Sequence, residues 1–144
     1  SFTDQDILEH ITINAIAPLR IARQLIRHMQ SVQYGRITFT SSIGVKFGGS
    51  ANHLPYSLSK HTSEFIPSEL LALSSKNIFT NVVRIGVTNT KRFRALGKNI
   101  DERVSLIPAK RIAKPQEIAD FLVWISSHEN KFMSGELVNY AGGE

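Results

Sequence analysis

The sequence contains no cysteine, no long apolar run and no cluster of metal-ligating residues. Without cysteine there is no disulfide, no thiolate nucleophile and no cysteine–zinc site. The histidines lack the spacing of metal ligands, so we expect no metal; they are His10, His28, His53, His61 and His128. No segment reaches the roughly 20 apolar residues that cross a bilayer, and the first residues do not resemble a signal peptide. We therefore expect a cytoplasmic protein without membrane contact.

The length of 144 residues and the 42% apolar content suit one domain with its own core. The net charge of +5 is uneven, because residues 76–114 hold ten Lys/Arg against Asp101 and Glu102, a local balance of +8. An anionic ligand, a nucleic acid and a solvated basic helix would each account for this stretch. No nucleic-acid motif accompanies it, so we expect no nucleic-acid partner.

Apolar residues at helical spacing predict four helices. These are expected over residues 3–31, 56–75, 91–99 and 115–127. The first should be capped by Thr3 or Asp4 and bent at Pro18. The second should be kinked at Pro67, because proline lacks the N–H of the helical ladder.

Runs of β-branched and aromatic residues predict three strands, over residues 36–40, 78–85 and 136–140. Between the first strand and the second helix, residues 41–55 form a glycine-rich loop, the usual place for site residues. Alternation of helices and strands predicts a parallel sheet wound by helices, hence an α/β fold. The first helix has no strand before it, so we expect residues 1–144 to form a single partial domain that begins in mid-fold.

Tyr56 and Lys60 are four residues apart at the start of the second predicted helix. In a helix this spacing places both side chains on one face, about one turn apart. A phenol beside a fixed positive charge ionises more readily than one in water, because the cation favours the phenolate. The pair makes Tyr56 a candidate general acid or base.

Six pieces of the sequence, in this order, resemble those of the short-chain dehydrogenase/reductase family. They are Asn14 in the first helix, the strand and two serines at 35–42, the Tyr-x-x-x-Lys pair at 56–60, the strand and loop at 81–90, the Pro-x-Glu-Ile-Ala start at 115–119 and the glycine-containing end at 135–143. The resemblance covers nearly all of the chain. It implies the C-terminal half of a doubly wound, Rossmann-type domain that binds a dinucleotide.

The resemblance also implies catalytic roles. Tyr56 would exchange a proton with the substrate oxygen, and Lys60 would favour its ionisation and hydrogen-bond the nicotinamide ribose. Ser42 would steady the substrate carbonyl, with Ser41 as the alternative because the glycine after the serines comes one residue early. Asn14 would hold a water that links to Lys60. The implied activity is an NAD(P)-dependent oxidoreductase that interconverts a secondary alcohol and a ketone.

The same resemblance assigns cofactor contacts, with NAD and NADP both open. Tyr56 and Lys60 would contact the dinucleotide, together with the loop residues Ile85, Gly86, Thr88 and Thr90. Ile85 stands where the family has a proline, which makes the start of this loop less rigid. Tyr140 stands where the family has an aspartate, and we expect it to have a structural role.

The family's glycine-rich turn for the pyrophosphate is absent from the sequence. We expect that turn, with four further strands, to lie upstream of Ser1, so that this chain is a truncated or partly recorded enzyme. The alternative is a shortened, non-catalytic homologue with a binding or regulatory role that does not hold a dinucleotide.

Partners follow from the resemblance as well. The two long helices, residues 3–31 and 56–75, usually form the subunit interface in this family, so we expect a homodimer or homotetramer. The substrate would be a small carbonyl compound or alcohol lying between the loop 44–55 and the segment 91–107. The basic residues there suit a polar or anionic substrate, such as a sugar derivative or an acyl thioester.

Overall fold

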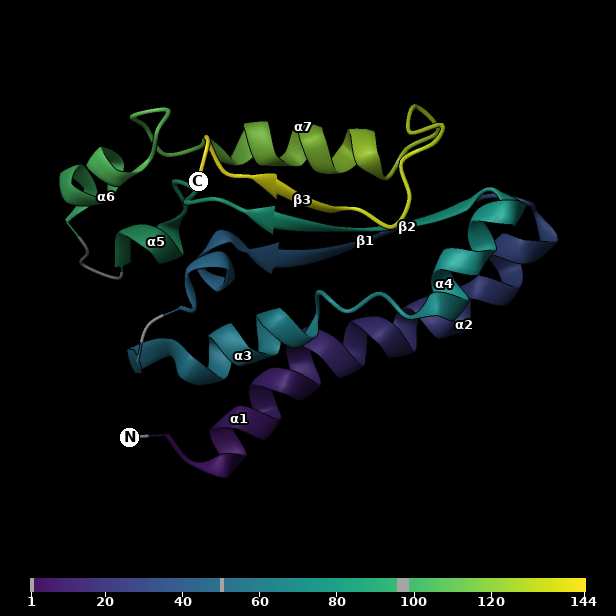
Figure 1. Cartoon of the computed structure of the whole chain (residues 1–144), viewed down its shortest axis with the longest axis horizontal. Helices are drawn as coiled ribbons and strands as arrows, with labels where there is room; N and C mark the ends of the chain where they lie inside the picture. The colour runs from purple at the N-terminus through teal and green to yellow at the C-terminus, as the bar shows by residue number, and fades with distance from the viewer. Residues whose placement is uncertain (1, 50, 96–98) are drawn as a thin grey trace.

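A three-stranded parallel sheet lies between two layers of helices in the computed structural model, which describes residues 2–49, 51–95 and 99–144. Helices α2, α3 and α4 lie on one face of the sheet and α7 lies on the other (Figure 1). The helices are α1 (Asp4–Ile11), α2 (Ala17–Ser31), α3 (Leu54–Thr62), α4 (Ser68–Ala72), α5 (Lys91–Ala95), α6 (Ile100–Leu106) and α7 (Pro115–Ile125). The strands are β1 (Gly35–Ser42), β2 (Ile78–Ile85) and β3 (Leu137–Tyr140). The predicted parallel α/β architecture is confirmed.

The register of the sheet brings the carboxyl ends of all three strands together. Ser42, the last residue of β1, pairs with Ile85, the last residue of β2. Ile85 in turn pairs with Tyr140 at the end of β3. The loops that follow the strands therefore start side by side at one edge of the sheet, where open α/β sheets bind ligands.

The first predicted helix is present but contains a π-helical turn, Thr12–Ile16, between α1 and α2. Thr3 caps α1 through a capping box with Asp6. The sequence predicted a bend at Pro18. The irregular turn instead comes before Pro18, which lies in the first turn of α2. Pro18 has no N–H to donate to the carbonyl of Asn14, so the regular ladder cannot continue there. Instead the N–H of Ala17 bonds back to Thr12, five residues earlier.

The prediction of one helix over residues 56–75 is wrong. Helix α3 starts at Leu54 and ends at Thr62, and α4 starts only at Ser68. Pro67 is the N-cap of α4 with ψ of 143°, an extended conformation. Proline also disfavours the helical region for the residue before it, so the chain is not helical at Ile66 and Pro67, and two separate helices form rather than one kinked helix.

The remaining elements follow the sequence closely, with one addition. Helix α5 covers the start of the predicted helix 91–99, of which residues 96–98 lie outside the described part of the chain. Helix α6 was not expected from periodicity, and the Asn99 side chain caps it by accepting from the N–H groups of Asp101 and Glu102. Helix α7 starts at the predicted proline.

The main core lies between the sheet and the helices α2 and α4. Its buried members are Ala22, Ile37, Phe39, Leu70, Ile78 and Val82. Ile78 and Val82 are fully inaccessible, as expected for the central strand β2. Among the described residues, no helix is both long enough and apolar enough to cross a membrane.

Candidate active site

Three elements that carry predicted site residues meet at the carboxyl edge of the sheet. Ser42 ends β1, and Tyr56 and Lys60 lie in the first and last turns of α3. Helix α3 contacts β1, the 3-10 turn Ile43–Phe47 after it, and the π-helical turn that holds Asn14. The fold therefore gathers all four predicted catalytic residues around one helix.

Lys60 is fixed beside the end of β1. Its Nζ donates a hydrogen bond of 2.9 Å to the carbonyl oxygen of Thr40, two residues before Ser42. The side chain is half-buried, and this burial lowers the pKa of the amine. A positive charge is thus held one helical turn from Tyr56, whose hydroxyl has no hydrogen-bond partner among the described residues. That hydroxyl is available to a substrate.

Asn14 is joined to the middle of α3 through Ser59. The Asn14 amide donates to the Ser59 hydroxyl over 3.0 Å, and that hydroxyl donates to the Tyr56 carbonyl over 2.8 Å. Ser59 is fully buried, which makes these bonds costly to break. The Asn14 carbonyl, which Pro18 deprives of its usual helical partner, can accept a bond from a water. Sequence reasoning missed Ser59, although it directly precedes Lys60.

The two serines at the end of β1 have different surroundings. The buried Ser41 hydroxyl donates to Glu64 over 2.7 Å, so its only proton is already in use. The Ser42 hydroxyl accepts from the Gly44 N–H over 3.3 Å, which leaves its proton free. Only Ser42 can donate a hydrogen bond to a substrate oxygen without breaking another bond.

Glu64 and Arg84 form a buried ion pair behind the site, which sequence reasoning also missed. Two hydrogen bonds of 2.7 Å join them, and their side chains are only 7% and 15% exposed. Burial opposes ionisation of Glu64, but the bonds from Arg84 and Ser41 and the Arg84 charge outweigh it and lower the pKa of Glu64. The signal in the sequence was an arginine inside the apolar strand β2.

The loop after β2 is held close to β3. Gly86 is required there, because a Cβ would lie 2.6 Å from the Cα of Ala141. The Thr88 hydroxyl donates to the Gly86 carbonyl, and the Thr90 hydroxyl accepts from the N–H of Phe93, which leaves the Thr90 proton free. Thr90 can thus donate to a ligand oxygen, whereas Thr88 can only accept.

These groups fit one end of a dinucleotide. Lys60 can donate to ribose hydroxyls, and the Thr90 hydroxyl and the backbone of the loop can meet a carboxamide or phosphate. The described residues contain no glycine-rich turn at a helix N-terminus for the pyrophosphate. They also contain no group of three or more His, Asp and Glu side chains that could hold a metal ion.

A family model described as enoyl-(acyl carrier protein) reductase matches residues 1–144. The chain belongs to the short-chain dehydrogenase/reductase family. A 3-oxoacyl-[acyl-carrier-protein] reductase, MabA of Mycobacterium tuberculosis, is 30% identical over 143 residues, which are 98% of this chain and 58% of that protein. The acetoacetyl-CoA reductase of Cupriavidus necator is 29% identical, over 92% of this chain and 54% of that protein.

Solved structures of this family share the fold. A 3-oxoacyl (acyl-carrier-protein) reductase from Agrobacterium tumefaciens with NADP bound has a TM-score of 0.86 at 21% identity, covering 100% of this chain and 58% of that chain. A 3-oxoacyl-[acyl-carrier protein] reductase from Brucella melitensis with bound NAD has a TM-score of 0.81 at 25% identity, covering 99% and 53%. The Rossmann-type fold is confirmed, and the chain spans little more than half the length of the curated relatives it matches.

Removing Arg84 should strongly destabilise the fold. Arg84→Leu leaves the buried Glu64 carboxylate without its charged partner, so we expect a loss of about 3 kcal/mol in the free energy of unfolding. The matched change Arg92→Leu, at an exposed residue with no partner among the described residues, should cost less than about 0.5 kcal/mol. Urea unfolding of both variants measures the difference, and equal stabilities would contradict the structural role of the pair.

The same pair should contribute to acid sensitivity. The pKa of Glu64 is below its ordinary value of 4.5 in the folded chain, so its stabilisation is complete above that value and is lost as the pH falls. Glu64→Gln, which keeps the side-chain size, should therefore flatten the dependence of stability on pH between about pH 5 and pH 3. An unchanged slope in that variant would rule out Glu64 as the titrating group.

Proposed function

We propose that the protein containing this chain is an NAD(P)-dependent oxidoreductase that interconverts a secondary alcohol and a ketone. Residues 1–144 would form the catalytic half of a single dinucleotide-binding domain. The observation that carries the proposal is the position of Tyr56 and Lys60 on α3, with Lys60 bonded to β1 two residues before Ser42. Membership of the family supports it.

Each catalytic side chain would have a separate task. A bound nicotinamide would supply or accept the hydride at the substrate carbon. Ser42 would donate to the substrate oxygen, where negative charge develops during reduction. Tyr56 would give its proton to that oxygen, or take it back in the reverse direction. Lys60 would stabilise the ionised phenol, and the Asn14 carbonyl would hold a water that passes protons toward Lys60.

We propose a 3-oxoacyl thioester as the substrate class. The relatives named above are reductases of 3-oxoacyl-[acyl-carrier-protein] and of acetoacetyl-CoA, both of which carry a ketone one methylene group away from the thioester carbonyl. The exposed basic residues Lys91, Arg92 and Arg94 of α5, just after the cofactor loop, suit a substrate whose carrier bears phosphate. Either NAD or NADP would serve as the cofactor.

A homodimer, alone or within a tetramer, would form through the helices of residues 3–31 and 56–75. Large apolar residues remain exposed along the first of these, namely Leu8, Ile13, Ile16, Ile21 and Leu25. Others are exposed over residues 54–71, namely Leu54, Leu58, Phe65 and Leu71. Apolar surface of this extent supports a protein partner.

The charges on the first helix favour a second copy in the antiparallel direction. Arg20, Arg23 and Arg27 line one side of α2 and have no partner within the described chain, and α2 has no acidic residue. Asp4 and Glu9 on α1 are likewise unpaired. In an antiparallel pair centred near Asn14 to Ile16, Arg20 lies opposite Glu9 of the second copy and Arg27 lies opposite Asp4. Such self-complementarity is what a twofold interface requires.

Tyr56→Phe should abolish turnover while sparing cofactor binding. Loss of the proton donor should lower kcat by at least about 100-fold in assays of the complete protein with a 3-oxoacyl thioester and NADH or NADPH. Tyr34→Phe, a change just before the first residue of β1 and far from its carboxyl end, is the control and should retain activity. Full turnover by Tyr56→Phe would overturn the proposed role. Absence of dinucleotide binding by calorimetry would instead favour a non-catalytic binding or regulatory protein.

The two serines should respond differently to removal of the hydroxyl. Ser42→Ala should lower kcat by about 100-fold, because the donor to the developing negative charge is lost. Ser41→Ala should leave kcat nearly unchanged and cost about 1 kcal/mol of stability, because it breaks the buried bond to Glu64. Steady-state kinetics and urea unfolding separate the two effects, and the reverse pattern would make Ser41 the catalytic serine.

Charge reversal should test the antiparallel interface. Arg20→Glu with Arg27→Glu, and separately Asp4→Arg with Glu9→Arg, should each weaken the dimer by placing like charges opposite each other. An equimolar mixture of the two double variants should form a heterodimer, because all four pairs are then opposite in charge. Sedimentation velocity measures the assembly. Unchanged dimers of each variant alone, or no association in the mixture, would exclude this arrangement.

A further inference from the structure

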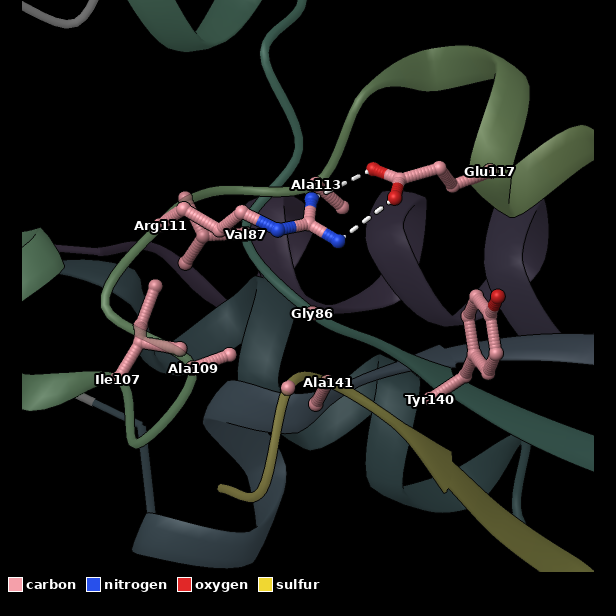
Figure 2. Close-up of a pocket in the computed structure, with 10 residues that line it drawn as sticks. Gly86, Val87, Ile107, Ala109, Arg111, Ala113, Glu117, Tyr140 and Ala141 are labelled. Carbon is pink, nitrogen blue, oxygen red and sulfur yellow. Dashed lines mark hydrogen bonds and ion pairs between the residues drawn. The ribbon is translucent and has the colours of Figure 1, made fainter.

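A cavity lies beside the loop that follows β2, away from the proposed catalytic residues. It has a volume of about 210 Å³ and is enclosed by the ends of β2 and β3 and the segment 107–117 (Figure 2). None of Asn14, Ser42, Tyr56 and Lys60 lines it.

The walls of the cavity are mostly apolar. Val87, Ile107, Ala113 and Ala141 contribute them. Val87 and Ala113 are also joined through the main chain, since the Ala113 N–H donates to the Val87 carbonyl over 2.9 Å. This wall is therefore fixed by backbone hydrogen bonds rather than by mobile side chains alone.

An aromatic column ends at the cavity. Trp124 stacks on Phe121 with centroids 5.9 Å apart, and Phe121 stacks on Tyr140 at 4.3 Å and an interplanar angle of 4°. Tyr140 lines the cavity whereas Phe121 does not, and Figure 2 shows the Tyr140 ring turned toward the open space. One face of the ring is covered by Phe121, and the other can accept a further ring.

The two charged side chains that line the cavity, Arg111 and Glu117, have opposite charges and form an ion pair. Arg111 donates two hydrogen bonds of 2.7 Å to Glu117 at the rim. The bonds from Arg111 and from the Lys114 N–H lower the pKa of Glu117 to about 2, so the carboxylate stays ionised. A neutral pair gives a charged ligand no net attraction. The carboxylate retains lone pairs that can accept an N–H or O–H, since it has about four acceptor positions.

We propose that this cavity binds a small, uncharged, planar aromatic molecule with one hydrogen-bond donor, stacked on Tyr140 and donating to Glu117. The volume is suitable, because a cavity of about 150 Å³ can hold benzene, and 210 Å³ leaves room for a substituted or fused ring. The aromatic column supplies the orientation, and the donor reaches the rim. This site does not depend on the proposed catalytic activity.

Indole is a suitable probe, with N-methylindole as the matched ligand that lacks the donor. In saturation-transfer difference NMR with the complete protein, indole should bind with a Kd near the millimolar range, as expected for so small a ligand. N-methylindole should bind several-fold more weakly. Gly86 belongs both to this cavity and to the predicted cofactor loop, so indole binding is measured without dinucleotide.

Three variants locate the binding. Tyr140→Leu should weaken indole about threefold to tenfold, since a stacked ring pair contributes about 0.5–1.5 kcal/mol. Ala109→Leu, which fills the cavity from its exposed wall, should abolish binding, whereas Ala119→Leu on α7 outside the cavity should not change it. No indole signal, a full signal with Ala109→Leu or Tyr140→Leu, or equal binding of N-methylindole would each overturn the proposal.

Discussion

Parallel pairing of β1 with β2 and of β2 with β3 is the constraint on which the rest of the structure depends. Parallel strands cannot be joined by a tight turn, so each connection runs back along the length of the strands. The next strand then starts at the same end of the sheet as the strand before it. The segments that follow the three strands therefore all begin at the carboxyl end of the sheet. Ser42, the loop at Gly86 and the end of β3 are neighbours for this reason, although they are far apart in the sequence.

The buried carboxylate of Glu64 gives the adjacent residues Ser41 and Ser42 different roles. Glu64 accepts a hydrogen bond from the Ser41 hydroxyl and two from Arg84, so it links the turn after α3 to β1 and β2. Two carboxylate oxygens with three donors are well satisfied, which offsets the cost of burying the charge. The half-buried neighbour Ser42 keeps its proton. In this way a structural ion pair determines which serine can meet a substrate.

Much of the fold could be predicted from the sequence, because the signals were local. The strand at 78–85, the helix that begins at Pro115 and the family resemblance are all confirmed. The single helix over 56–75 failed because apolar spacing continues across Pro67, whose backbone geometry overrides it. Helix α6 was missed because only Asn99 marks its start.

The residues of the candidate site could be predicted from the sequence, but the hydrogen bonds and ion pairs that hold them in place could not. Tyr56 and Lys60 follow from helical spacing together with the family resemblance, and the structure confirms that they share α3. The links from Asn14 to Ser59 and from Glu64 to Arg84 join positions 45 and 20 residues apart, and no periodicity encodes such pairs. Catalytic roles for these residues stay predictions.

The π-helical turn at Thr12–Ile16 changes the rotation of α1 about the helix axis relative to α2. Such a turn is equivalent to one residue inserted into a regular helix, and each residue of an α-helix rotates the chain by about 100°. Everything N-terminal to the turn is therefore offset in rotation relative to α2. Deletion of one residue there would rotate α1 by about 100° relative to α2 and turn the face of α1 that contacts α3 away from it. The π-helical turn thus lets α1 contact α3 while α2 packs against β1, although the two helices differ in rotation.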